Sequence, residues 1–126
     1  MGAVGYLLDT HTLLWALRDS PKLGCKTKQV IENSDFPIYV SAVSAYEITN
    51  KYRLNKLDEY KDIVMKYSQA LQDFGAVEIP VSSWQAQFAG RFKWAHRDPF
   101  DRILAAQAYL GDMTLLTNDP AFNGLP

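Results

Sequence analysis

Acidic side chains in this sequence recur beside short apolar segments. Asp9 and Asp119 each closely follow an apolar run, Asp101 opens a segment with helical periodicity, and Glu47 lies within an apolar helical turn. If these segments converge, the carboxylates meet in one pocket and raise one another's pKa values unless a cation neutralises them. Hard divalent cations such as Mg²⁺ prefer such oxygen ligands. The pattern therefore predicts a magnesium site.

A cation held by carboxylates suits the hydrolysis of a phosphodiester bond. One or two bound ions lower the pKa of a water to make a nucleophile and hold the phosphate. Thr117, two residues before Asp119, can hydrogen-bond a ligand carboxylate or a water on the metal, with a structural role at the end of its strand as the alternative. Zinc is not expected, because the chain has two well-separated histidines and one cysteine.

Each acid also has a purely structural explanation. Asp9, Asp98 and Asp119 stand where they can cap a helix, and Asp101 lies in a first turn, where negative charge favours the helix dipole. Glu47 can be a solvated helix residue, although apolar neighbours indicate partial burial and hence a partner. Singly, the structural explanation is favoured. The conjunction of the acids favours a site.

Apolar periodicity indicates strands separated by helices. The expected strands are 4–8, 36–40, 77–81 and 113–116, and the expected helices are 10–17, 22–33, 41 or 44 to 54, 59–74, 82 or 83 to 92, and 99–110. This order predicts an α/β sandwich with a mostly parallel sheet. Sites in such folds lie at the carboxyl ends of the strands, which is where Asp9 and Asp119 fall.

Length and composition fit one soluble domain over residues 1–126. No apolar run reaches the ~20 residues of a membrane span, and no basic segment precedes the first apolar run, so neither a membrane anchor nor a signal peptide is expected. The single cysteine, Cys25, favours a reducing cytoplasm. The net charge of −1 means that any contact with RNA must be local and assisted by metal.

Four segments resemble the PIN-domain ribonucleases and, more closely, the VapC toxins of bacterial toxin–antitoxin pairs. They are LLDTH (7–11), the 41–57 stretch with YEI at its centre, HRDPFDR (96–102) and LLTNDP (115–120), in the same order over nearly the whole chain. The most specific of these is 96–102. Related chains continue past the last acid into a further short strand, whereas this sequence ends at residue 126.

The resemblance implies a PIN-like three-layer α/β/α sandwich and an endoribonuclease that depends on Mg²⁺ or Mn²⁺ and leaves a 5′-phosphate. It also implies a VapB-type antitoxin partner, an RNA substrate and, commonly, a homodimer. By motif position, the catalytic and metal-ligating acids are Asp9, Glu47, Asp101 and Asp119. Asp98 matches a nearby acid that assists the site or caps its helix, and Thr117 matches a hydroxyl beside it.

Basic and aromatic residues flank the acids. Lys51, Arg53, Arg97 and Arg102 are candidates for gripping RNA phosphates, with a solvated surface as the equal alternative. Arg102 can instead pair with an acid in the site. Among the aromatic residues, Trp15 is expected in the core, while stacking on bases stays open for Trp84 and Trp94. A partner surface rich in tyrosine is open for the middle helices, with core packing as the alternative; its members are Tyr46, Tyr52, Leu54, Tyr60 and Tyr67.

Two other classes of protein are alternatives to the nuclease. An inactive module of the same fold that assembles with a protein partner would be favoured by a neutral residue in place of an acid, and none is seen. A phospho-receiver domain needs paired acids after the first strand and a lysine near the last one. Here Thr10 follows Asp9, and no lysine follows Met113. A nucleotide-binding glycine loop is also missing.

Overall fold

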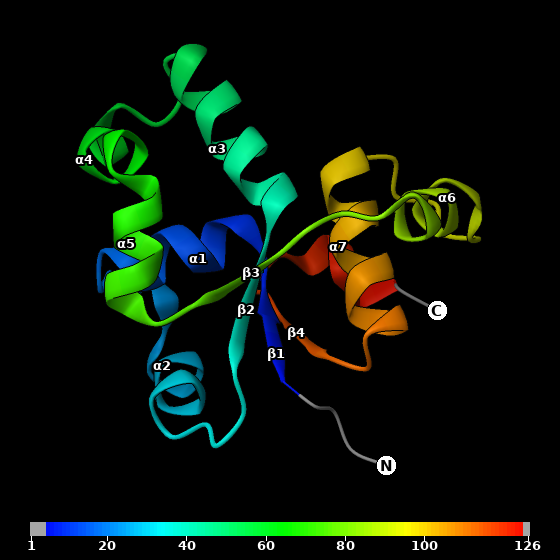
Figure 1. The fold of residues 1–126 in the computed structure, drawn as a ribbon, viewed down its shortest axis with the longest axis horizontal. Coiled ribbons are helices and arrows are strands. Elements are labelled where there is room, and N and C mark those ends of the chain that lie inside the picture. Colours follow the sequence, from blue (N-terminus) through cyan, green and yellow to red (C-terminus); the bar gives the residue numbers. More distant parts are fainter. Residues whose placement is uncertain (1–4, 125–126) are drawn as a thin grey trace.

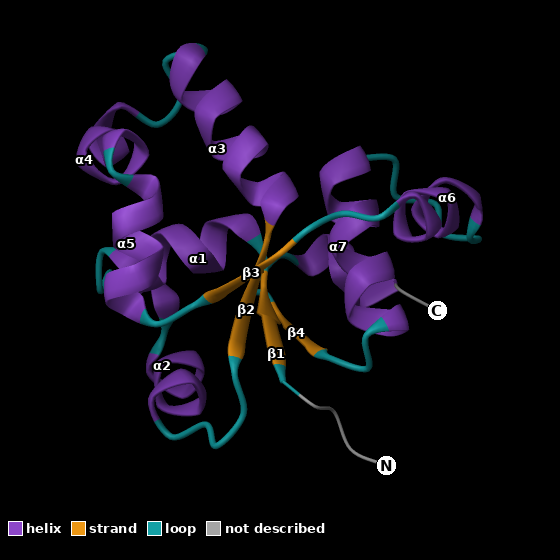
Figure 2. Ribbon diagram, in the orientation of Figure 1, coloured by secondary structure: helices purple, strands orange, loops and turns teal. Residues whose placement is uncertain are grey.

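The computed structural model describes residues 5–124, in which four parallel strands form one sheet (Figures 1 and 2). The strands are β1 (Tyr6–Leu8), β2 (Ile38–Ser41), β3 (Val77–Ile79) and β4 (Thr114–Leu116), in the order β3-β2-β1-β4. Leu7 of β1 pairs with Tyr39 on one side and Leu115 on the other. The expectation of a mostly parallel sheet is confirmed.

Helices cover both faces of the sheet, as expected for a three-layer α/β/α sandwich. They are α1 (Thr10–Leu17), α2 (Cys25–Glu32), α3 (Ala42–Arg53), α4 (Lys61–Met65), α5 (Tyr67–Phe74), α6 (Ser83–Arg91) and α7 (Pro99–Leu110), with short 3₁₀ turns η1 (Pro21–Leu23), η2 (Asp58–Tyr60) and η3 (Pro120–Gly124). In Figure 1, α1, α2, α4 and α5 lie on one side of the strands and α6 and α7 on the other. Within residues 5–124, no helix combines the length and apolar character needed to cross a bilayer.

Each side of the sheet has its own core. Successive strand residues point to opposite faces, and Leu7 and Leu8 are both fully buried, one in each core. Leu8 packs in a cluster that includes Leu14 of α1 and Ile48 of α3, whereas Leu7 packs against Leu104 of α7. Two buried faces explain why β1 reads as a continuous apolar run.

Side-chain caps start the helices that follow the strands. Ser41 accepts a hydrogen bond from the Val43 amide at the start of α3, and Ser82 forms a capping box with Gln85 at the start of α6. Asp98 caps α7, with Pro99 as its first residue. Ser41, not Ser44, therefore caps α3, and Ser82, not Ser83, caps α6.

Two predicted boundaries differ from the structure for reasons that lie in a single residue. The helix expected over 22–33 begins at Cys25, because Gly24 has a φ of +86°, a conformation that favours glycine. The strand expected over 77–81 ends at Ile79, because Pro80 has no amide to donate to a sheet. Residue 4 of the first expected strand lies outside the described residues.

The helix expected over 59–74 is divided. Lys66, with φ −126° and ψ 41°, separates α4 from α5, and the two helices run in different directions in Figure 1. Ile63 of α4 and Tyr67 of α5 both pack on the core cluster around Leu8. Tertiary packing therefore sets this break, since no glycine or proline lies between residues 61 and 74.

Candidate active site

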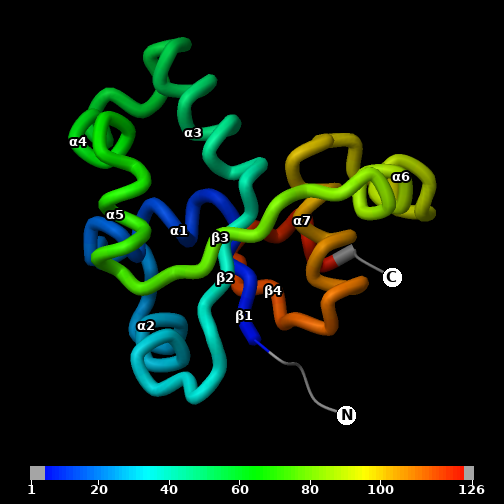
Figure 3. Tube along the Cα trace, viewed as in Figure 1, coloured from blue at the N-terminus to red at the C-terminus, as the bar shows by residue number. Residues whose placement is uncertain are grey.

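Asp9 lies at the carboxyl end of β1 with 5% of its surface exposed. One carboxylate oxygen accepts the Thr12 amide at 2.8 Å, so Asp9 caps α1, and the other accepts the Thr117 hydroxyl. The Asp9 amide donates to the Leu116 carbonyl at 3.1 Å. These bonds join the ends of β1 and β4. The two strands lie side by side in Figure 3, although they are more than 100 residues apart in the sequence.

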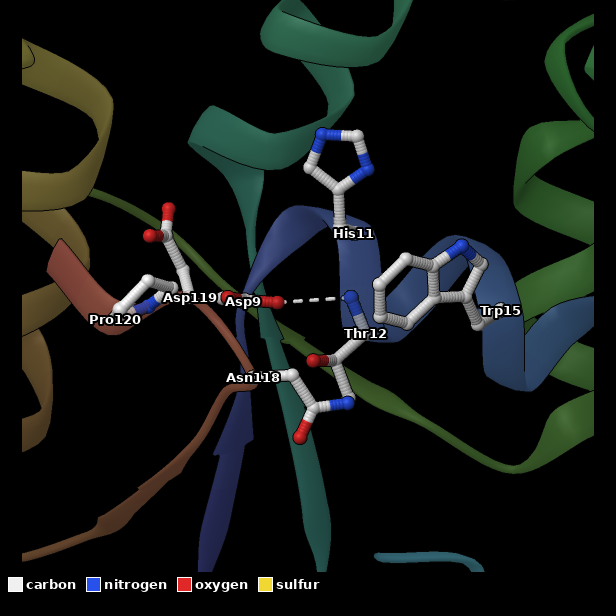
Figure 4. Close-up of a pocket in the computed structure, with 7 residues that line it drawn as sticks. All are labelled: Asp9, His11, Thr12, Trp15, Asn118, Asp119 and Pro120. Atoms are coloured by element: carbon white, nitrogen blue, oxygen red, sulfur yellow. Dashed lines mark hydrogen bonds between the residues drawn. The ribbon is translucent and has the colours of Figure 1, made fainter. Parts of the chain in front are cut away.

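Asp119 follows β4 and faces the same hollow as Asp9. Its amide donates to the Thr117 hydroxyl at 3.0 Å, and its carboxylate accepts the Ala121 amide at 2.9 Å, which starts η3. Asp9 and Asp119 both line a pocket of about 280 Å³ (Figure 4). The structure therefore brings these two predicted acids together.

Glu47 of α3 is 5% exposed and has two polar partners. It accepts the Thr10 hydroxyl at 2.6 Å and the Lys51 ammonium at 2.7 Å. The expected burial with a partner is confirmed. Because Thr10 directly follows Asp9 in the chain, its hydroxyl connects Glu47 to the end of β1. Sequence reasoning missed this role of Thr10, whose available signal was its position next to Asp9.

Asp101 in the first turn of α7 pairs with His96, at 2.7 Å between carboxylate and ring nitrogen. Burial raises the pKa of Asp101 above its ordinary value of 3.8, the His96 hydrogen bond lowers it, and the charges of Asp98 and Glu47 raise it further. Asp101 and Glu47 therefore lie within electrostatic reach of each other. Asp98 accepts the Phe100 and Asp101 amides through one oxygen and so caps α7.

The basic candidates differ in their contacts. Arg102 neither pairs with an acid nor offers its guanidinium to phosphates, because four of its five N–H groups donate to the carbonyls of Ala89, Phe92, Trp94 and His96 at 2.6–2.9 Å. Lys51 is bound to Glu47. Arg53 is exposed and donates to Asn50, and Arg97 is exposed. The expectation for Arg102 is therefore corrected to a structural role.

The aromatic residues divide between core and surface. Trp15 packs against the core cluster around Leu8, as expected. Trp84 is 59% exposed, whereas the Trp94 ring stacks on Phe92 and lies tilted against His96, with ring centroids 5.7 Å and 4.9 Å apart. Of the tyrosine-rich set on the middle helices, Tyr46 is 62% exposed, while Tyr60 is buried. Tyr46 is thus the clearest exposed aromatic of that set.

The donor chemistry of these residues fits a hard cation. The groups are carboxylates supported by hydroxyls, and the charges of Asp98 and Glu47 both act on Asp101. In the conformation seen, Glu47 faces Lys51 and Asp101 faces His96, and among residues 5–124 no three His, Cys, Asp or Glu side chains are arranged to hold a metal ion. Asp101 pairs with His96 through one oxygen, whereas both oxygens of Glu47 accept hydrogen bonds, from Thr10 and Lys51, so a cation would compete with these partners at Glu47.

The chain is an α/β/α protein in which helices cover both faces of a parallel sheet. Acidic residues lie at the carboxyl ends of the strands. Residues 6–126 match the PIN domain, and the chain belongs to the PIN domain family. Its fold is similar to that in a solved structure of VapBC2 from Rickettsia felis, in which VapBC2 is bound to a DNA fragment from its promoter. The TM-score is 0.61 at 17% sequence identity, over 94% of this chain and 90% of that chain. No functionally curated protein matches the sequence significantly.

Proposed function

We propose that this chain is a metal-dependent endoribonuclease and the toxin of a toxin–antitoxin pair, built as a single PIN domain over residues 1–126. The observation that carries the proposal is the meeting of Asp9 and Asp119 in one pocket, with Glu47 joined to the same strand end through Thr10. PIN domains are generally nucleases, and all four acids of the predicted set are present.

Asp9, Glu47, Asp101 and Asp119 would hold one or two Mg²⁺ or Mn²⁺ ions. When bound, such an ion supplies a water of lowered pKa and positive charge against the phosphate. The chain itself orients the acids, because Thr117 donates to Asp9 and Thr10 donates to Glu47. Asp98 assists by fixing the start of α7, where Asp101 lies. The expected products carry a 5′-phosphate.

The proposed partners are a VapB-type antitoxin, an RNA substrate and a second copy of the chain, in the cytoplasm. The similar solved structure is a VapBC2 complex, which supports an antitoxin partner. Among the basic residues, exposed Arg97 and Arg53 are the better candidates for RNA phosphates, since Lys51 is bound to Glu47 and Arg102 to carbonyls.

Incubation of the purified chain with total cellular RNA tests the proposal. We expect discrete cleavage with Mg²⁺ or Mn²⁺, none with EDTA, and none with Asp119→Asn. Asp119 is exposed, so this isosteric change should leave the fold intact, which circular dichroism checks. Metal-independent cleavage that survives in the variant would refute the site. A folded, antitoxin-free chain without any cleavage would favour the inactive PIN-fold module that assembles with a protein partner.

A further inference from the structure

The pocket that contains Asp9 and Asp119 extends beyond the acids toward α1. Its lining is drawn in Figure 4 and comprises Asp9, His11, Thr12, Trp15, Asn118, Asp119 and Pro120. Its volume of about 280 Å³ lies just below the ~300–1,000 Å³ of sites for drug-sized ligands. The space therefore suits one small ligand next to the acids.

Thr12 lines this pocket and carries a buried hydroxyl that the protein does not use. The residue is 1% exposed, and its hydroxyl has no hydrogen-bond partner among residues 5–124. Threonine inside a helix commonly donates to a carbonyl one turn earlier, but Thr12 is the third residue of α1 and has no earlier turn. A buried hydroxyl without a partner is costly, which points to a ligand that completes it.

The other walls offer stacking and a second polar group. Trp15 is half-buried and held against the core, so its ring presents a fixed apolar surface. Asn118 is exposed, and its amide nitrogen donates to the Leu23 carbonyl at 3.4 Å, the long end of the hydrogen-bond range. The Asn118 amide can therefore turn toward a ligand at little cost.

We propose that this pocket binds one unpaired nucleoside of the RNA, next to the phosphate that is cut. The base would stack on Trp15, and its edge would hydrogen-bond to the Thr12 hydroxyl and the Asn118 amide, which both donate and accept. Stacking on an aromatic ring tolerates any base, whereas the two polar groups select among bases. Thr12 and Asn118 are then specificity-determining residues. This inference rests on the proposed nuclease function.

Cleavage by paired variants tests the pocket. Thr12→Val removes a hydroxyl without a protein partner, so the variant should fold like the wild type, and exposed Asn118→Ala should as well. We expect each to lower kcat/KM about tenfold, a factor that corresponds to about 1.4 kcal/mol, and to broaden the base preference at the cleaved bond. Thr27→Val on α2, outside the pocket lining, is the matched control. Unchanged preference and kcat/KM in both pocket variants would overturn the inference, whereas a wild type that cuts no RNA would refute the proposed function instead.

A binding measurement separates the pocket from catalysis. The four nucleoside 5′-monophosphates are titrated to millimolar concentration, with Mg²⁺, into ¹⁵N-labelled protein. We expect the Trp15 indole N–H resonance to shift with at least one of them, and this shift to weaken in Thr12→Val. The Trp84 indole, on exposed α6 and outside the pocket lining, is the internal control. A Trp15 resonance that moves no more than that of Trp84 with all four nucleotides would overturn the inference.

Discussion

Lys51 neutralises Glu47, a carboxylate whose side chain is only 6% exposed, while the Lys51 side chain is 30% exposed. Lys51→Met would leave Glu47 with the Thr10 hydroxyl and without an ion-pair partner among residues 5–124. We expect the free energy of unfolding to fall by about 1–3 kcal/mol, the usual cost of a buried charged group that loses a partner. Urea denaturation with and without Mg²⁺ measures this effect.

A cation that binds Glu47 should restore part of that loss, because it binds the folded chain and not the unfolded one. Lys56→Met, at an exposed position, is the control and should change stability by less than about 0.5 kcal/mol. If Lys51→Met were as stable as the wild type, the ion pair would not contribute to the free energy of unfolding. If Mg²⁺ left the variant unchanged, Glu47 would not be a ligand.

Asp101 gives the protein a stability that depends on pH. Burial, opposed by the His96 hydrogen bond and reinforced by Asp98 and Glu47, raises the pKa of Asp101 above 3.8 in the folded chain. Below pH 3.8 both the folded and unfolded chains hold the proton, and the group contributes nothing. As the pH rises, the unfolded chain loses this proton first, so folding becomes less favourable until the pH passes the raised pKa.

We therefore expect Asp101→Asn to be more stable than the wild type at pH 7, with a difference that disappears below pH 3.8. The amide of the variant keeps an oxygen that can accept from His96, so the comparison isolates the charge. Thermal unfolding between pH 3 and pH 8 measures both proteins. A wild type that gains stability over the variant as the pH rises through this window would contradict the raised pKa.

Among single residues, the sequence predicted the places of the acids better than their partners. Asp9 and Asp119 could be placed at one edge of the sheet, because each follows a short apolar strand and parallel strands have their carboxyl ends at the same edge. Glu47 could be expected to be buried and paired, and Lys51, four residues later on the same predicted helix, stands at the spacing of a helical ion pair. Thr10 could not be named as a partner. Thr10 lies 37 residues away from Glu47, and no local pattern reports such a contact.

Between elements, Arg102 holds the connection from α6 to α7. Its guanidinium binds four carbonyls in residues 89–96 and lies 4.6 Å from the centre of the Phe92 ring. Arg102→Lys keeps the charge but cannot reproduce this fork of donors. We expect a loss of about 2–4 kcal/mol in unfolding free energy and lower nuclease activity, because His96 and hence Asp101 lose their support.

Chemical denaturation and RNA cleavage measure the two effects. Exposed Arg91→Lys, in the preceding helix, is the matched control and should change both only slightly. If Arg102→Lys were fully stable but unable to bind RNA, Arg102 would be a phosphate contact after all.

Among whole elements, the strands and most helices followed from local patterns, and the exceptions have particular causes. Gly24 delays the start of α2 because its φ is positive, and Pro80 ends β3 because it has no amide to donate to the sheet. The break at Lys66 has no such signal and comes from packing on the shared core. The hydrogen bonds of Arg102 to carbonyls in residues 89–96 could not be predicted from the sequence. Their acceptors are backbone groups, which are the same for every residue type.

For the molecule as a whole, charge limits how RNA can be held. The chain has thirteen lysine and arginine residues and fourteen aspartate and glutamate residues, which gives a net charge of −1. In EDTA, where the chain is expected not to cut, we expect labelled RNA to bind no tighter than the ~10⁻⁴–10⁻⁶ M of non-specific contacts. Fluorescence anisotropy measures this affinity. Sub-micromolar binding in EDTA would mean that a basic surface, not a cation, holds the RNA.

We propose that Asp9, Glu47, Asp101 and Asp119 bind a divalent cation together, although Glu47 and Asp101 now face Lys51 and His96. The most direct test is calorimetric titration of the purified chain with Mn²⁺, repeated for the isosteric variants Asp9→Asn, Glu47→Gln, Asp101→Asn and Asp119→Asn. We expect one or two ions per chain and at least about tenfold weaker binding in each variant, the lower end of the effects seen even for outer groups of metal sites. A wild type that binds no Mn²⁺, or four variants that bind it as tightly as the wild type, would show that these acids do not form a metal site.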